Sequence, residues 1–260
     1  MLFNYNRYHN AVFMGVANEV IGKVYQQYNR VEYYFQLKKT NDSLVKANER
    51  LYNKLKQDFQ MPYTANKLSI DTIKVDSLTK YRKYLYMEAK VRDNTVNLPN
   101  NYLVLERGSL QGVKKDLGVI DLNNAVVGTV INVSNNYSVV MSLLHSQSNI
   151  NGMLKKTGET GSVIWDDKRD PQFVLLKEIK KGVKVSKGDS VLTSGHSERF
   201  PYGKLIGTVE DVANDKSTNT YTIRLKTAAN FYNEEYVYII DDLQKEEPQE
   251  LLKVARKSHE

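Results

Sequence analysis

The strongest constraint on this chain is a row of short β-type segments between residues 86 and 240. About twelve such segments follow one another, and no helical pattern separates them. Turn signals divide them at 108–109, 123–124, 135–136, 158, 181–182, 187–188 and 201–203. Many short strands at regular spacing are typical of antiparallel barrels or sandwiches. Because about twelve strands divide evenly, we predict a mainly β fold with two small six-stranded antiparallel β-barrels.

One long α-helix is predicted before the strands, over residues 15–60, a stretch that contains no proline. Leucines recur every seven residues, and taking them as position d of a heptad places asparagines at position a. A buried Asn at position a favours two parallel helices in a fixed register. The residues predicted to form this parallel dimer are Tyr34, Leu37, Asn41, Leu44, Asn48, Leu51 and Leu55. Packing of the helix on its own domain is the alternative.

These patterns divide the chain into six parts. Pro62 marks the predicted end of the helix, and the charged residues after Asp242 predict a disordered tail. The last strands, at 205–240, can either continue the second barrel or return to close the first. The predicted parts are 1–14 (next to a membrane span), 15–60 (helix), 61–85 (connector), 86–148 (first barrel), 149–204 (second barrel) and 241–260 (tail).

Composition argues against several functional classes. The chain has no Cys and four His, which rules out disulfides and thiol catalysis and speaks against a zinc site, so we expect no metal and no cofactor. Its net charge is +7, but the basic residues are scattered without a stripe, so we expect no nucleic-acid binding. No stretch approaches the roughly 20 apolar residues of a membrane span. Leu2 and Phe3, followed by tyrosines, are typical of chain just past the end of a span. An ordinary frayed N-terminus is the alternative, which these residues alone slightly favour.

Gly188, Asp189 and Ser190 resemble the start of a trypsin-like nucleophile segment, and His145 lies upstream. A serine nucleophile, however, needs a tight turn whose N–H groups form an oxyanion hole. Here Val191 and Leu192 follow, so Ser190 belongs to a strand. A single His at a strand end is usually a surface residue. We therefore predict no catalytic residues and interpret Gly188 and Asp189 as a β-turn.

The whole run "KGDSVLTSGHSERFPYGKLIGTVEDV" resembles the signature region of the MreC family of bacterial rod shape-determining proteins. The segments around Gly112, Gly118 and Gly128, and the stretch "GSVIWDD", also resemble that family. The motif residues are Gly188, Asp189, Thr193, Ser194, Gly195, Phe200, Pro201, Gly203, Ile206, Gly207 and Val209.

The resemblance implies a non-enzymatic dimeric scaffold outside the cytoplasmic membrane, anchored by an N-terminal span missing from this sequence. It implies as partners a second copy of the chain, possible filaments of such dimers, the elongation-type penicillin-binding protein, MreD, RodA and MreB. An adaptor subunit of an export complex is the alternative, although such adaptors usually have two paired helices around a lipoyl-like unit. A trypsin-like hydrolase is the third reading.

Overall fold

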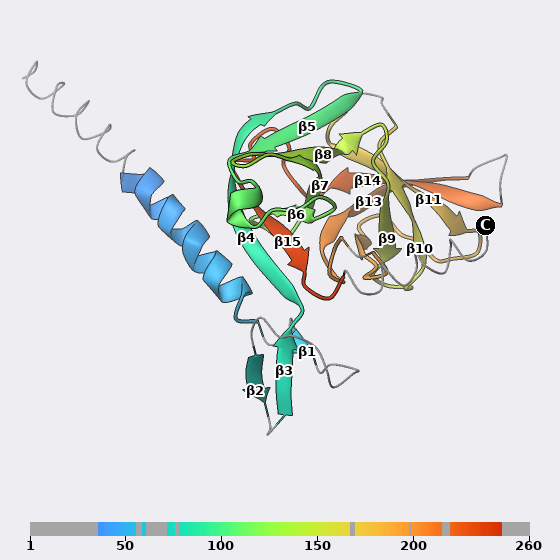
Figure 1. Ribbon diagram of the computed structural model, residues 1–260. Helices are drawn as coiled ribbons and strands as arrows, with labels where there is room; N and C mark the ends of the chain where they lie inside the picture. The colour runs from blue at the N-terminus through green and yellow to red at the C-terminus, as the bar shows by residue number, and fades with distance from the viewer. Residues whose placement is uncertain are drawn as a thin grey trace, which may run out of the picture. The chain divides into compact units, whose positions relative to one another are not determined.

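The computed structural model describes residues 36–55, 59–60, 72–75, 78–166, 170–197, 199–214 and 219–245. The predicted 1–14 segment lies outside these ranges. Two closed barrels account for most of the described residues, as Figure 1 shows. The predicted fold class, a long helix followed by two six-stranded antiparallel barrels, is confirmed.

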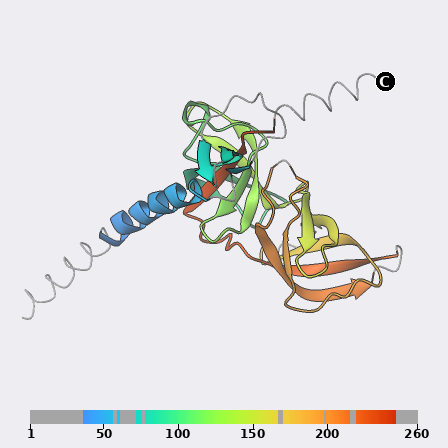
Figure 2. The same cartoon turned by 90° about the horizontal axis from the view of Figure 1, so that it is seen from below.

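The first barrel has the strand order β15-β4-β5-β8-β7-β6, and every neighbouring pair is antiparallel. In Figure 2 it is the green barrel that includes one red strand. That red strand, β15, pairs with β4 on one side and with β6 on the other. The strands are β4 (Tyr84–Asn94), β5 (Asn100–Leu105), β6 (Gly118–Asp121), β7 (Val126–Val133), β8 (Ser138–His145) and β15 (Tyr236–Asp242).

The second barrel has the order β10-β11-β14-β13-β12-β9 and is coloured yellow to orange in Figure 2. Its strands are β9 (Ile150–Leu154), β10 (Thr160–Ile164), β11 (Phe173–Lys180), β12 (Ser190–Thr193), β13 (Leu205–Asn214) and β14 (Thr220–Thr227). The prediction that this barrel ends at residue 204 is wrong, because β13 and β14 complete it. The second barrel is therefore inserted between β8 and β15 of the first.

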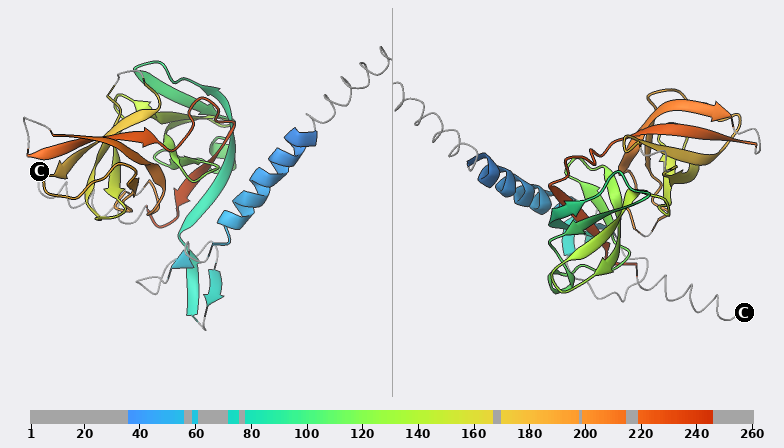
Figure 3. Two further views of the ribbon diagram at one scale, coloured as in Figure 1. Left: turned by 180° about the vertical axis from the view of Figure 1, so that it is seen from behind. Right: turned by 90° about the horizontal axis from the view of Figure 1, so that it is seen from above.

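Each barrel fills its interior with side chains from alternate strand positions. In β5, Asn101, Leu103 and Leu105 point inward and are buried, while Tyr102 is exposed and Val104 half-buried. Closure gives every barrel strand a hydrogen-bonded neighbour on both sides. Both views in Figure 3 show β15 among the green strands of the first barrel.

The described helix covers residues 36–52 and ends in a turn at 53–54. The prediction that it continues to residue 60 is wrong, and Leu55 lies past its end. The side chain of Asn53 explains the ending: its Nδ2 donates to the Tyr86 carbonyl (2.9 Å), and its Oδ1 accepts from the Tyr86 N–H (2.9 Å). These bonds attach the chain to β4 instead of extending the helix.

The predicted connector contains a three-stranded antiparallel sheet of order β1-β3-β2. Its strands are β1 (Phe59–Gln60), β2 (Thr72–Val75) and β3 (Leu78–Arg82). The chain forms two compact units, Met1–Asn48 and Glu49–Glu260. The second unit therefore includes the last turn of the helix, this sheet and both barrels.

Candidate functional site: the junction between the barrels

The motif begins with a tight turn before β12. Gly188 has φ +89°, and the Asp189 N–H donates to the Ser186 carbonyl at 3.1 Å. The Asp189 carboxylate in turn accepts the Ser186 N–H at 2.9 Å. Hydrogen bonds of Gly188 and Asp189 with Val209 join the turn to β13. The structure thus has the predicted turn, with Gly in the left-handed region and Asp as its cap.

Thr193 closes the loop between β12 and β13. Its buried hydroxyl donates to the Pro201 carbonyl at 2.6 Å and accepts the Lys204 N–H at 2.9 Å. Its backbone N–H donates to the Lys204 carbonyl, and its carbonyl accepts from Gly203. Gly195 and Gly203, at φ +73° and +89°, give the loop its two left-handed residues. A hydroxyl at 193 therefore satisfies two buried backbone groups at once.

The loop packs Phe200 against the first barrel. Phe200 is buried, and a Cβ added to Gly118 of β6 would lie 2.7 Å from its ring and would overlap the Arg199 carbonyl. Only glycine at 118 allows this close approach. The Phe-Pro-x-Gly part of the motif is thus a contact between the barrels, a role that its sequence did not reveal.

Asn124, in the hairpin between β6 and β7, receives two hydrogen bonds from the second barrel. Its Oδ1 accepts from Lys204 Nζ at 2.7 Å, and its carbonyl accepts from the Leu205 N–H at 3.1 Å. A parallel bridge joins Ala125 to Leu205 beside these bonds. Asn124 has φ +69°, a conformation that Asn tolerates better than most residues.

Two carboxyl groups lie on the first-barrel side of this junction. Burial raises the pKa of Asp121, although hydrogen bonds from the Asn123 and Ala125 N–H groups oppose the shift. Burial, together with the nearby charge of Asp121, raises the pKa of Glu234 to about 7. Glu234 belongs to the segment that leads from β14 back to β15, so a group that titrates near neutrality lies on the connection between the barrels.

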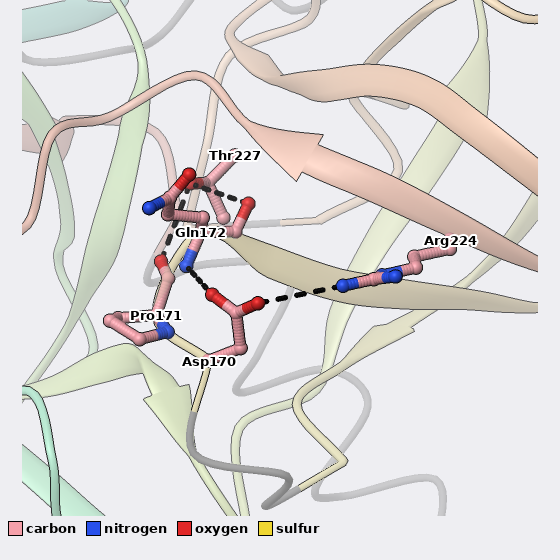
Figure 4. A network of polar contacts seen from close by, with 5 residues as sticks. All are labelled: Asp170, Pro171, Gln172, Arg224 and Thr227. Carbon is pink, nitrogen blue, oxygen red and sulfur yellow. Dashed lines mark hydrogen bonds and ion pairs between the residues drawn. The ribbon is translucent and has the colours of Figure 1, made fainter.

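A second polar network fixes the entry to β11, as Figure 4 shows. Asp170 accepts the Gln172 N–H at 3.1 Å and lies 3.5 Å from Arg224 of β14. The Arg224 guanidinium also lies 3.6 Å from the centroid of the Phe173 ring. Thr227, the last residue of β14, donates to the Gln172 carbonyl at 3.2 Å. These contacts hold the segment before β11 on β14, where the chain leaves the second barrel.

Ser190 and His145 do not form a catalytic pair in this structure. Ser190 opens β12 of the second barrel, whereas His145 ends β8 of the first. The prediction that His145 is a surface residue is wrong, because its side chain is buried. Nδ1 accepts the Gln147 N–H at 3.0 Å, and Nε2 lies 2.9 Å from the Tyr102 hydroxyl. Burial lowers the pKa of His145, which favours the neutral ring these bonds require.

Most of the predicted dimer residues lie on the described helix. Leu37, Leu44 and Leu51 are 49%, 56% and 62% exposed, and Asn41 and Asn48 are also exposed. Tyr34 lies outside the described residues, and Leu55 follows the helix end.

Among the described residues, no group of three or more His, Asp or Glu side chains is placed to hold a metal ion. In that same part of the chain, no helix is both long enough and apolar enough to cross a membrane. The fold and the junction define a class of proteins in which a helix precedes two closed six-stranded barrels, one inserted in the other, that meet at the loop carrying Phe200.

Residues 91–241 match the family described as "Rod shape-determining protein MreC, barrel core". The chain therefore belongs to the MreC family. It is 29% identical to the cell shape-determining protein MreC of Bacillus subtilis over 216 residues, which cover 75% of this chain and 72% of that protein. It is 27% identical to the Listeria monocytogenes protein of that name over 168 residues, 64% of this chain and 57% of the relative.

Solved structures share the fold. MreC of Listeria monocytogenes superposes with a TM-score of 0.56 at 24% identity, covering 82% of this chain and 93% of that one. MreC of Helicobacter pylori, solved in a complex with the penicillin-binding protein PBP2, superposes with a TM-score of 0.51 at 16% identity. That alignment covers 62% of this chain and all of the other.

Proposed function

We propose that this chain is a cell shape-determining scaffold that works at the outer face of the cytoplasmic membrane. In this proposal, the helix pairs two copies of the chain and the barrels bind an elongation-type penicillin-binding protein. The MreD, RodA and MreB proteins complete the assembly. The observation that carries the proposal is the match of the whole barrel region to the MreC family. That match favours a scaffold over an export adaptor or a hydrolase.

The helix supports the pairing. A stripe of three leucines about half exposed, with Asn at the alternate heptad positions, is the surface that a parallel two-stranded coiled coil buries. Leu51, in the helix turn that belongs to the same compact unit as the barrels, is 62% exposed, which supports the pairing at that end of the helix.

The outer face of β5 and β8 supports the partner contact. Tyr102 pairs with Met141, and Val104 pairs with Val139, so four apolar side chains lie together on the outside of the first barrel. All four are exposed or half-buried. Outward positions of a barrel in water are usually polar, so an apolar patch there suits a protein partner.

The test is interferometry with the extracytoplasmic part of the cell's elongation penicillin-binding protein. We expect saturable binding by the full chain and by residues 49–260, because the barrels lie in the second compact unit. We expect Val139→Lys with Met141→Lys to abolish binding. The matched control is Leu175→Lys, a half-buried outward position of β11 in the second barrel, which should bind normally. Absence of binding by the unmodified chain contradicts the proposed partner.

A further inference from the structure

Lys204, the residue that follows the Phe-Pro-x-Gly turn, is a buried lysine with contacts to three parts of the chain. It is 5% exposed, and its ammonium donates to Asn124 at the tip of a first-barrel hairpin. The same ammonium lies 4.8 Å from the centroid of the Tyr86 ring and 5.6 Å from that of Tyr52. An ammonium over a tyrosine ring within about 6 Å is attracted by the ring face, most strongly away from water.

The two rings belong to an aromatic cluster that joins the helix end to the first barrel. Tyr52, the last helical residue, stacks on Tyr86 of β4 with centroids 5.1 Å apart and planes 25° apart. The centroid of the Tyr52 ring also lies 5.2 Å from the centroid of the Tyr238 ring in β15. β5 pairs with β4 only from Val91 onward, so the earlier part of β4 is open on that side. The Asn53 side chain binds the backbone of Tyr86 there.

We propose that Lys204 is a positioning residue that couples the end of the helix to the arrangement of the two barrels. Its side chain leaves the second barrel, bonds to the first, and faces the last ring of the helix. A displacement of Tyr52 changes the environment of a buried charge. The Lys204 ammonium then regains its stabilising contacts only if the segment 199–204 moves. Since that segment also carries Phe200 against Gly118, the barrel contact moves with it.

The inference deepens the proposed scaffold, because it describes how pairing of the helices reaches the barrels. Its test measures a distance inside one chain and no partner, so it holds or fails separately from binding of a penicillin-binding protein.

The chain has no cysteine, so two introduced cysteines carry spin labels without competition. Leu110→Cys places a label on the first barrel, where Leu110 is 73% exposed, and Lys184→Cys places one on an exposed loop of the second. Electron double resonance on labelled chain diluted with unlabelled chain gives the distance between barrels. We expect one narrow distance distribution for the doubly labelled chain that carries no further substitution. In Lys204→Met we expect this distribution to broaden.

The decisive variant is Tyr52→Leu, which lies in neither barrel. We expect it to broaden the distance between barrels as Lys204→Met does, whereas Tyr52→Phe keeps the ring and the narrow distribution. Lys187→Met is the matched control: an exposed lysine of the second barrel that pairs with Glu210 instead of the junction. It should leave the distribution unchanged.

Asn124→Gly provides a second route should Lys204→Met prevent folding. Glycine accepts the φ of +69° at this position and removes only the side-chain acceptor, so the hairpin should fold and the distribution should broaden. A narrow distribution in Tyr52→Leu overturns the coupling, even if Lys204→Met and Asn124→Gly both broaden it. Lys204 would then act as a contact between barrels only.

Discussion

Thr193→Val tests the closure of the motif loop with little change of shape. Valine replaces the hydroxyl by a methyl group, so the Pro201 carbonyl loses its hydroxyl donor and the Lys204 N–H loses its hydroxyl acceptor. Thr193, Pro201 and Lys204 are all buried. A buried polar group that loses its partner costs about 1–3 kcal/mol, and the additional buried methyl returns about 0.8 kcal/mol. Since two buried groups lose their partners, we expect the free energy of unfolding to fall by about 1–5 kcal/mol.

Urea unfolding followed by tryptophan fluorescence measures this change. The only tryptophan is Trp165, which is 3% exposed and follows β10 of the second barrel, so its emission reports the barrel that contains the loop. The matched control is Thr208→Val, at a half-buried position of β13, for which we expect a change below about 0.5 kcal/mol. The midpoint should fall while the urea dependence stays constant. An equal midpoint for Thr193→Val and wild type would refute the argument.

Three further predictions concern the helix, the loop and the titrating groups. Leu44→Asp with Leu51→Asp should give a monomer with intact barrels in analytical ultracentrifugation, and a persisting dimer contradicts the proposed pairing. Gly195→Ala should lower the melting temperature, because φ is +73° and the new Cβ would lie 2.9 Å from that of Tyr202; an unchanged melting temperature would remove the special role of this glycine. The folded-state pKa of His145 lies below 6.5, so the stability that depends on the neutral ring is full above pH 6.5 and is lost as pH falls through the folded-state value. The stability contributed by Glu234 depends on pH in the opposite direction. Because the pKa of Glu234 is raised from 4.5 to about 7, this contribution is full below pH 4.5 and is lost as pH rises through 7. In His145→Gln, the fall of the urea midpoint as pH drops below 6.5 should be smaller than in wild type. In Glu234→Gln, the urea midpoint should no longer fall as pH rises from 4.5 to 7. An unchanged pH profile in either variant contradicts the assignment of that group.

The strands could be predicted from sequence because their information is local. Short apolar and β-branched segments bounded by turn residues mark β4 to β15, and Gly188 marks its turn by the conformation that glycine permits. The barrel to which each strand belongs could not be predicted in the same way, because β13 and β14 have the same local pattern whichever barrel they complete. Only pairing over long sequence separations, such as that of β15 with β4, decides it.

The junction shows the same limit. The hydrogen bond from Lys204 to Asn124 joins residues 80 positions apart, so no local sequence pattern predicts it. The helix end was misplaced for a related reason. Pro62 is a local stop signal, but the helix ends earlier because Asn53 finds two backbone partners on β4, 33 residues away. His145 was placed at the surface because a strand end is usually exposed, whereas Tyr102 covers it from the neighbouring strand.

The position of β15 also governs the order in which the chain can fold as it emerges. The second barrel is continuous, from Ile150 to Thr227, and all of its strands are present once β14 has been made. The first barrel starts earlier but lacks its closing strand until Asp242 has been made. Until then β4 and β6 present unpaired edges, which are prone to incorrect pairing with other chains. The barrel that begins first is therefore completed last, and a chain shortened after β14 would keep one barrel closed and leave the other open.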